Sequence, residues 1–276
     1  MIRIIIARVF RLLFKFSFFE KRFFGFHKRF FAPKNIFQNI VQTVKFKGYI
    51  KMELHIGDWI QENIYFLDKY EEAELIYLKS SLKKGNVFID IGANIGVYSL
   101  FSSSILGQDG RVISFEPFSK NYNLFKKNIS LNNYQNIQAE KIAISDMSND
   151  IEIYYDEEET NLGMASSYAT NSYTISETVK ATTLDDYIND KNISSLDFIK
   201  IDIEGGEFKA VQGMIKTLKS FYPKLLVEIL DDTKDKESLV KLLDDIGYKK
   251  FFIKNNGEIS EKETNPNRKN FVFIKR

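Results

Sequence analysis

The sequence contains no cysteine, and it has only two histidines and four prolines among its 276 residues. The absence of cysteine excludes disulfides, thiolate zinc sites and cysteine nucleophiles. His27 and His55 are 28 residues apart and do not form the HExxH motif of zinc proteases, so we expect a metal ion to be held by oxygen, which favours magnesium, calcium or manganese. The low proline content argues against a chain that is rich in linkers or disordered.

Positive charge is concentrated at the start of the chain. Residues 1–34 contain nine basic side chains and one acid, Glu20, whereas the remaining residues contain 30 basic and 36 acidic side chains. The same segment holds ten of the 25 phenylalanines. Arginine and lysine interrupt its apolar residues too often for a membrane span, and it lacks the apolar core and small-residue cleavage site of a signal peptide.

This mixture of aromatic rings and cations is typical of a helix that lies in a membrane interface. We therefore predict that residues 1–31 make peripheral contact with an anionic membrane, and that the protein is cytoplasmic, on the inner face of that membrane. The alternative is that the apolar side packs on the rest of the chain or on a second subunit, forming a homo-oligomer. We do not expect a nucleic-acid partner, because the basic residues alternate with large apolar ones.

The rest of the chain predicts an α/β fold. Helical spacing is found at about 95–106, 118–132, 205–220 and 233–246, between short apolar runs at 87–92, 111–117, 137–144, 197–205 and 224–230. Continuous apolar strands that alternate with helices predict a parallel sheet covered on both faces. Two last runs, 248–254 and 270–276, are joined by a polar loop and must pair antiparallel. The expected fold is thus a doubly wound, Rossmann-like sheet of five parallel strands plus a C-terminal antiparallel hairpin.

Three segments follow from these patterns. Residues 1–34 form a basic amphipathic extension that ends near Pro33, and residues 35–85 form a lead-in with alternating strands and a helix at about 70–83. Residues 86–276 form the sheet domain, in which ligands are expected beyond the carboxyl ends of the strands, near the point where strand order reverses.

A glycine-containing loop follows the first strand of this domain in the run DIGANIGVYS, residues 90–99. Gly92 removes a side chain that would block a ligand from the backbone, and Asn94 tolerates left-handed geometry. Gly96 opens the next helix, where exposed amides can take a carboxylate or a phosphate. The dinucleotide fingerprint GxGxxG fails because its second and third glycines fall on Asn94 and Val97, which disfavours a nicotinamide enzyme.

The second strand ends at Glu116, next to Pro117. A carboxylate at the tip of the neighbouring strand can accept hydrogen bonds from both hydroxyls of a ribose, which favours a nucleoside ligand. The alternative is an ordinary turn with an acid that caps the next helix.

The runs DIGANIGVYS, FEP, TTLDDYI, DFIKIDIEGGE and LLVEI, in this order, resemble the FkbM family of S-adenosylmethionine-dependent methyltransferases. Residues 57–75 also resemble the lead-in of that family. The resemblance covers about residues 50–230 and does not cover residues 1–40. It implies a class I methyltransferase fold, an adenosylmethionine cofactor, and usually O-methylation, often of sugars in bacterial glycans or of natural products.

The resemblance also implies roles for individual residues. Its cofactor-binding positions are Asp90, Gly92, Asn94, Gly96, Tyr98, Ser99, Glu116 and Ala143. The loop residues match the surroundings of the methionine part, Glu116 matches the acid that binds the ribose, and Ala143 falls where such folds line the adenine. The run DIEGGE matches the family pattern DxEGxE at Asp202, Glu204 and Glu207. Many relatives have a histidine after the acid of the fifth strand, where this chain has Ile229 after Glu228.

Methyl transfer to a hydroxyl needs alignment of the acceptor oxygen and removal of its proton. Asp202 and Glu204, at the tip of the fourth strand, and Glu228, in the fifth, are therefore the catalytic candidates. They would act as a base, as hydrogen-bond acceptors, or as ligands of Mg²⁺ or Mn²⁺, for which Asp202 and Glu228 are the candidates. The alternative for Glu228 is a buried structural acid, and for Glu207 an acid that satisfies backbone donors.

The polar segment 156–180 is rich in Ser, Thr, Asn and Tyr, which suit carbohydrate, and a long loop of this kind is often a lid. Its acceptor-binding candidates are Asn161, Gly163, Ser166 and Ser167, unless the segment is a disordered excursion. The expected function is O-methylation of a sugar hydroxyl in a bacterial surface glycan or its precursor, as a step of polysaccharide biosynthesis. Methylation of a non-carbohydrate metabolite and a non-catalytic membrane-associated scaffold remain as alternatives.

Overall fold

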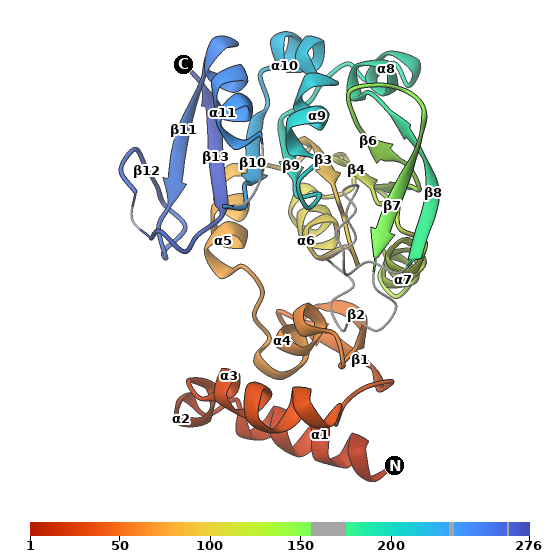
Figure 1. Ribbon diagram of the computed structural model, residues 1–276, viewed down its shortest axis with the longest axis vertical. Helices are drawn as coiled ribbons and strands as arrows, with labels where there is room; N and C mark the ends of the chain where they lie inside the picture. The colour runs from red at the N-terminus through yellow and green to blue at the C-terminus, as the bar shows by residue number, and fades with distance from the viewer. Residues whose placement is uncertain (156–174, 232–234, 264) are drawn as a thin grey trace. The chain divides into compact units, whose positions relative to one another are not determined.

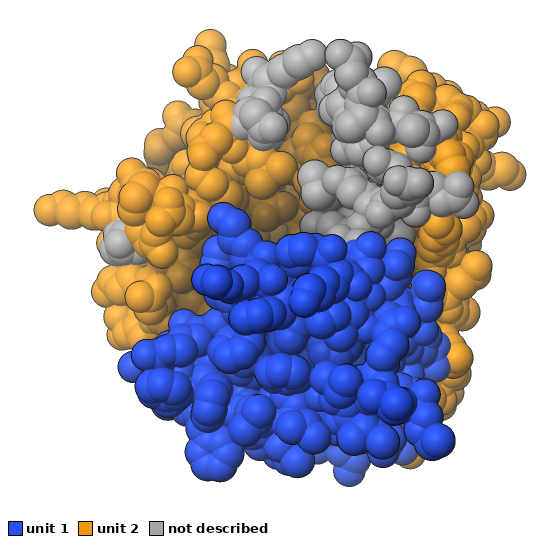
Figure 2. Space-filling model, turned by 60° about the horizontal axis from the view of Figure 1, so that its bottom comes forward, with its two compact units in different colours: residues 1–71, 158–163 blue, residues 72–157, 164–276 orange. Residues whose placement is uncertain are grey.

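The computed structural model of the protein describes residues 1–155, 175–231, 235–263 and 265–276 (Figure 1). The chain divides into two compact units, coloured blue and orange in Figure 2. Among the described residues, the first unit holds residues 1–71 and the second begins at Glu72. The division falls within the lead-in segment, between helix α4 (Trp59–Leu67) and helix α5 (Glu72–Ser81).

The first unit consists of short helical pieces followed by a hairpin and α4. Helix α1 (Ile2–Leu13) is its longest helix, and the pieces after it are α2 (Ser17–Glu20), α3 (Phe23–Phe26), the π-helix η1 (His27–Phe31) and the 3₁₀-helix η2 (Ala32–Lys34). Strands β1 (Val41–Phe46) and β2 (Ile50–His55) pair antiparallel. In the described part of the chain, no helix combines the length and the apolar character that a membrane span needs.

Aromatic rings form the core of the first unit. Phe14, Phe23 and Phe31 are buried, and all three lie against Phe66 of α4, with ring centroids 5.7–5.8 Å apart. Each such pair contributes about 0.5–1.5 kcal/mol beyond the apolar area that it buries. One side of the N-terminal segment therefore packs on residues of the same unit.

The second unit is built on a large mixed sheet (Figure 1). Among the described residues its strand order is β12-β11-β13-β10-β9-β3-β4-β5. The strands are β3 (Val87–Ile91), β4 (Arg111–Phe115), β5 (Ile137–Glu140), β9 (Phe198–Ile201), β10 (Lys224–Glu228), β11 (Tyr248–Ile253), β12 (Ile259–Ser260) and β13 (Asn270–Lys275). The five strands from β10 to β5 are parallel, whereas β13, β11 and β12 are antiparallel to their neighbours. Strand order reverses between β3 and β9, which is where such a sheet binds ligands.

Helices cover both faces of this sheet, as the apolar strands predicted. On one face, Ile89 and Ile91 belong to a buried cluster that includes residues of α8 (Leu184–Asp190), α9 (Glu207–Gln212), α10 (Ile215–Phe221) and α11 (Lys236–Asp245). On the other face, α6 (Val97–Leu106) packs against β3 and β4, and α7 (Ser119–Ser130) packs against β5. The α/β fold with a mostly parallel sheet is thereby confirmed.

Three boundaries differ from the sequence prediction. Residues 175–180, expected as the end of a polar loop, belong to a strand that runs to Thr182 and pairs with residues 150–155. The strand expected at 137–144 ends at Glu140, and Ala143 instead begins the short strand β6 (Ala143–Ile144) in a three-stranded sheet with β7 (Asp150–Tyr155) and β8 (Ile175–Thr182). Ala143 packs there against Ile153 and Val179, which draw it away from the main sheet. The helix expected at 205–220 breaks at Gly213, where a Cβ would lie 1.9 Å from the carbonyl oxygen of Ser145.

Candidate active site

The glycine loop lies at the switch point and is held by the strands on both sides of β3. The backbone N–H groups of Gly92 and Ala93 donate to the carbonyl oxygen of Phe115, at 2.9 and 3.0 Å. Gly92 has φ +83°, and a Cβ at this position would lie 1.8 Å from the carbonyl oxygen of Asp202. Position 92 therefore requires glycine, because the chain that leaves β9 passes too close for any side chain. The residues around Gly92 in the sequence give no sign of this contact. Asn94 adopts the left-handed conformation, which asparagine tolerates better than most residues, with φ 51°.

Behind the loop, Asp90 ties β3 to the first turn of α6. Its Oδ2 atom accepts a hydrogen bond from the Ser99 hydroxyl at 2.5 Å, and that hydroxyl also lies 2.8 Å from the hydroxyl of Ser114. Asp90 is fully buried, and its Oδ1 atom has no hydrogen-bond partner among the described residues. Burial raises the pKa of Asp90, and the nearby Lys200 ammonium acts in the opposite direction. Asp90 and Ser99 thus support the loop from the interior.

Glu116, at the tip of β4, bonds to the glycine loop directly. Its Oε2 atom accepts the N–H of Asn94 at 2.7 Å, and its Oε1 atom accepts the N–H of Phe118, the N-cap residue of α7, at 2.9 Å. The side chain is almost completely buried, and burial raises the pKa of Glu116 to about 7. A carboxylate oxygen has two lone pairs, so each oxygen can accept a further hydrogen bond.

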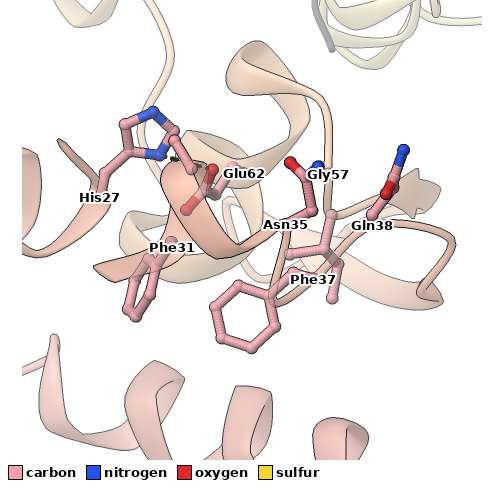
Figure 3. A pocket seen from close by; sticks show the side chains of 9 residues that line it. His27, Phe31, Asn35, Phe37, Gln38, Gly57 and Glu62 are labelled. Atoms are coloured by element: carbon pink, nitrogen blue, oxygen red, sulfur yellow. Dashed lines mark hydrogen bonds and ion pairs between the residues drawn. The ribbon is translucent and has the colours of Figure 1, made fainter. Parts of the chain in front are cut away.

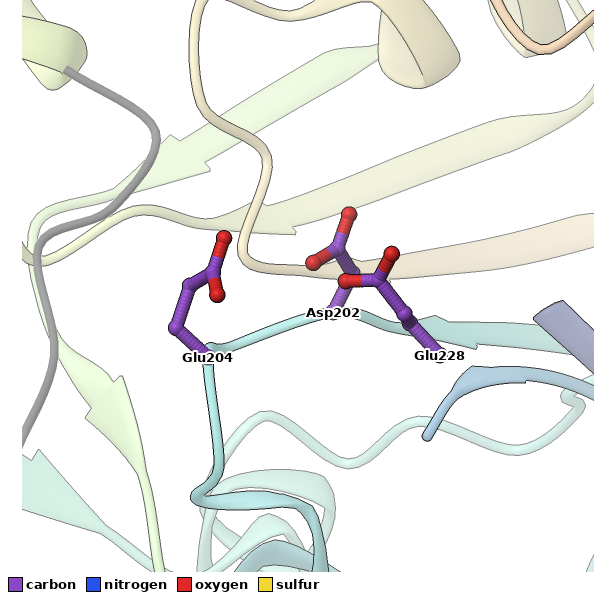
Figure 4. Close-up of side chains that lie close together, drawn as sticks. All are labelled: Asp202, Glu204 and Glu228. Carbon is purple, nitrogen blue, oxygen red and sulfur yellow. The ribbon is translucent and has the colours of Figure 1, made fainter. Parts of the chain in front are cut away.

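The three catalytic candidates come together at the ends of two neighbouring strands (Figure 4). Asp202 directly follows β9, Glu204 lies two residues further, and Glu228 is the last residue of β10. One carboxylate oxygen from each residue lies within 4.8 Å of the others. Sequence reasoning predicted this convergence from the parallel arrangement of β9 and β10.

Glu207 stabilises the turn that places Glu204. Its Oε1 atom accepts the N–H groups of Ile203 and Gly205 at 3.2 and 3.1 Å, while Glu204 itself has φ 53°. Glu207 is 2% exposed, and burial raises its pKa. The side chain therefore satisfies backbone donors, the role that the sequence left open as an alternative.

Lys200 is a member of this site that the sequence analysis did not identify. It is 3% exposed, and its Nζ atom lies 2.8 Å from Oδ2 of Asp202 and 4.6 Å from the centre of the Tyr98 ring. Although burial opposes it, the Lys200 ammonium and a hydrogen bond with Glu228 hold the pKa of Asp202 below its ordinary value. The sequence did contain one sign of its role, a lysine inside the otherwise apolar run FIKI. In the structure all four residues of this run are buried.

The other predicted positions are distributed as follows. Tyr98 and Ser99 lie buried in the first turns of α6, and Ala143 pairs with Ala181 in the three-stranded sheet. The acceptor-binding candidates lie outside the described residues: Asn161, Gly163, Ser166 and Ser167.

A protein-family model described as "Methyltransferase FkbM domain" matches residues 90–250, which is more than half of the chain. The chain belongs to the FkbM methyltransferase family. The matched range contains the glycine loop, Glu116, Lys200 and all three clustered carboxylates. The family assignment made from sequence motifs is thus confirmed, and this FkbM protein is a methyltransferase.

Named relatives of this FkbM methyltransferase are distant. It is 22% identical over 205 residues to Methyltransferase 1 of Beauveria bassiana, covering 67% of this chain and 81% of that protein. It is 21% identical over 221 residues to Methyltransferase sdnD of Sordaria araneosa, covering 67% and 85%. A crystal structure of Methyltransferase FkbM from Methylobacillus flagellatus aligns with a TM-score of 0.48 and 17% identity. That alignment covers 77% of this chain and 52% of the crystallised one, so the present chain spans about half of its length.

Proposed function

We propose that the protein is an S-adenosylmethionine-dependent O-methyltransferase whose acceptor is a sugar hydroxyl of a bacterial surface glycan or its precursor. The observation that supports this most strongly is the convergence of Asp202, Glu204 and Glu228 at the switch point. The Gly92 loop lies in direct contact with the backbone of Asp202 there, so a donor held by the loop would be next to an acceptor held by the carboxylates.

The residues around the loop suit adenosylmethionine. The ribose diol needs hydrogen-bond acceptors, and Glu116 has unused lone pairs on both oxygens. The sulfonium is a cation, and the switch point is rich in carboxyl groups, with Lys200 as the buried cation among them. When bound, the cofactor supplies an activated methyl group. The loop from Gly92 to Gly96 would hold its methionine part, and Asp90, Tyr98 and Ser99 would support that loop.

Asp202 is the residue that we assign to the acceptor proton. Its lowered pKa makes it a weak base, so it would accept the proton only as bond formation makes the acceptor hydroxyl acidic. Its contact with the Lys200 ammonium keeps it ionised and fixed in orientation. Glu204 and Glu228 would accept hydrogen bonds from other hydroxyls of the acceptor and align its oxygen.

A divalent cation on Asp202 and Glu228 is the second arrangement that the cluster supports, since their oxygens are close enough to share an ion. Mg²⁺ or Mn²⁺ would lower the pKa of the acceptor hydroxyl and replace the base. The contact between Lys200 and Asp202 disfavours this arrangement, because an ammonium already occupies one side of that carboxylate.

The sugar acceptor is supported by the number of carboxylate acceptors in the cluster and by the hydroxyl-rich composition of residues 156–180. A non-carbohydrate metabolite is the alternative acceptor, and a scaffold without turnover is the alternative function. The test is transfer of a labelled methyl group from adenosylmethionine to a panel of surface glycans, nucleotide sugars and hydroxylated metabolites, with and without chelator. We expect a labelled glycan or nucleotide sugar and no effect of chelator.

Each other outcome would contradict a different part of this proposal. Loss of activity in chelator that Mg²⁺ or Mn²⁺ restores would replace the base with the metal. Labelling of metabolites alone would remove the sugar acceptor. Binding of adenosylhomocysteine without transfer to any member of the panel would favour the scaffold.

A further inference from the structure

Helix α1 has a second apolar face that the fold leaves exposed. Its buried side includes Ala7, and Phe14 just after the helix continues that side. The exposed side carries Ile2, Ile5, Val9 and Leu12, which are between 49% and 74% exposed. Their spacings of three, four and three residues place them in one stripe along the helix. A helix at the surface of a soluble protein normally presents polar residues on the side away from its core.

Exposed aromatic rings also occur in the pieces of chain that follow α1. The segment also exposes Phe16, Phe18, Phe24 and Phe30, each to at least 43%. We call the four stripe residues and these four rings the exposed apolar face. Single exposed apolar residues need no explanation, whereas a stripe of four along one helix with four exposed rings in the same segment favours an interaction surface.

Cations accompany this face. Arg8 and Arg11 are three residues apart on α1, Lys15 follows just after the end of the helix, and Arg8 and Lys15 are exposed. Other exposed cations of the segment are Lys21, Arg22, Lys28, Arg29 and Lys34. Its single acid, Glu20, forms an ion pair with Lys69.

The helix is fixed with the stripe outward. The guanidinium of Arg3 donates to the carbonyl oxygens of Ile36 at 2.6 Å and Gln38 at 2.7 Å. On the buried side, the Phe14 ring packs on Phe66 of α4. The exposed apolar face is therefore presented by a structured unit.

We propose that the exposed apolar face docks onto a bilayer with anionic headgroups, with α1 in the plane of the interface. The stripe and the rings would lie at the level of the acyl chains, and Arg8 and Lys15 would contact headgroup phosphates. A second copy of the chain fits this surface less well. A symmetric interface brings the same surface of both copies together, so two strongly basic segments would face and repel each other. The proposal concerns the first unit and does not depend on the acceptor of methyl transfer.

The test is co-sedimentation of the full chain with vesicles of phosphatidylcholine alone and of phosphatidylcholine with about one third phosphatidylglycerol, at low and high salt. We expect binding to the anionic vesicles that weakens with salt, and little binding to the neutral ones. The double variant Ile5→Gln/Leu12→Gln should bind at least about tenfold more weakly. Its matched control, Ile76→Gln/Met147→Gln, changes two exposed apolar residues of the second unit and should bind like the wild type.

The charge contribution has its own pair of variants. Arg8→Gln/Lys15→Gln should bind anionic vesicles about 25-fold more weakly, since each cation near such a surface contributes about fivefold. Its control, Lys126→Gln/Lys219→Gln, removes two exposed lysines of the second unit and should change nothing. Circular dichroism confirms that each variant is folded. Equal binding by all variants, or no binding to anionic vesicles, would overturn the proposal. A dimer in ultracentrifugation that Ile5→Gln/Leu12→Gln abolishes, without vesicle binding, would assign the face to a second copy.

Discussion

Replacement of Glu116 by glutamine tests its proposed role as the ribose acceptor. Hydrogen bonds to a charged group contribute about 1.5–3 kcal/mol each, so loss of the carboxylate should weaken adenosylhomocysteine binding by about 1–3 kcal/mol, or roughly 5- to 150-fold. The substitution also affects the protein itself. Glutamine has one acceptor oxygen, whereas Glu116 accepts the N–H groups of both Asn94 and Phe118. One backbone donor loses its partner, which should lower the free energy of unfolding by about 1–3 kcal/mol.

A ligand without ribose hydroxyls separates these two effects. Calorimetry should compare adenosylhomocysteine with its 2′,3′-dideoxy analogue in the wild type and in Glu116→Gln. If Glu116 binds the diol, the variant loses affinity for adenosylhomocysteine and has nearly the wild-type affinity for the analogue. Equal losses for both ligands would refute the ribose role and leave Glu116 as a support of the glycine loop.

The wild type and Glu116→Gln should also differ in how their affinity for adenosylhomocysteine depends on pH. Burial raises the pKa of Glu116 to about 7, so the fraction of the stronger acceptor, the carboxylate, increases between pH 6 and 8. The affinity of the wild type for adenosylhomocysteine should therefore rise across this range, and that of Glu116→Gln should stay flat. An identical pH profile in both proteins would show that another group controls binding.

Three further predictions concern stability, and equilibrium unfolding measures each of them. Gly92→Ala should lower the free energy of unfolding by at least about 2 kcal/mol, because its Cβ would meet the Asp202 carbonyl oxygen. The control Gly85→Ala has a similar φ of +82° with open space and should cost about 1 kcal/mol; equal losses would exclude the clash. Lys200→Met should cost about 3–5 kcal/mol by leaving buried carboxylates uncompensated, and adding Asp202→Asn should restore part of it. In the first unit, burial and the Asp58 charge raise the pKa of Glu62 from 4.5 to about 8, while the side chain lies 2.8 Å from the His27 ring (Figure 3). This raised pKa contributes stability below pH 4.5 that is lost as pH rises through 8, and Glu62→Gln should remove that loss; a wild-type profile in the variant would contradict the shift.

The sheet and the carboxylate cluster were predictable because their causes are local in the sequence. Continuous apolar strands that alternate with helices rarely form anything other than a parallel sheet with helices on both faces. In such a sheet the carboxyl ends of neighbouring strands meet at one edge. Asp202 directly follows β9 and Glu228 is the last residue of β10, so the two residues had to be neighbours once these strands paired.

Other features depend on contacts between distant segments. The partners of Lys200 and the need for glycine at position 92 arise only when β3 and β9 are adjacent. The run at 137–144 gave no sign that Ala143 would join β8, which follows it by more than thirty residues. At the start of the chain, Phe14 and Leu12 are equally apolar, and only the position of Phe66 determines that Phe14 is buried while Leu12 is exposed.

The most direct test of the proposed active site compares the wild type with Asp202→Asn in transfer of a labelled methyl group from adenosylmethionine to the acceptor found in the panel. The amide has almost the same volume and can still accept the Lys200 hydrogen bond, so adenosylhomocysteine affinity should stay within a few-fold of the wild type. The proton acceptor is lost, and the turnover number should fall by roughly 10²–10⁴-fold. Wild-type turnover in Asp202→Asn would contradict the assignment of Asp202 to the reaction.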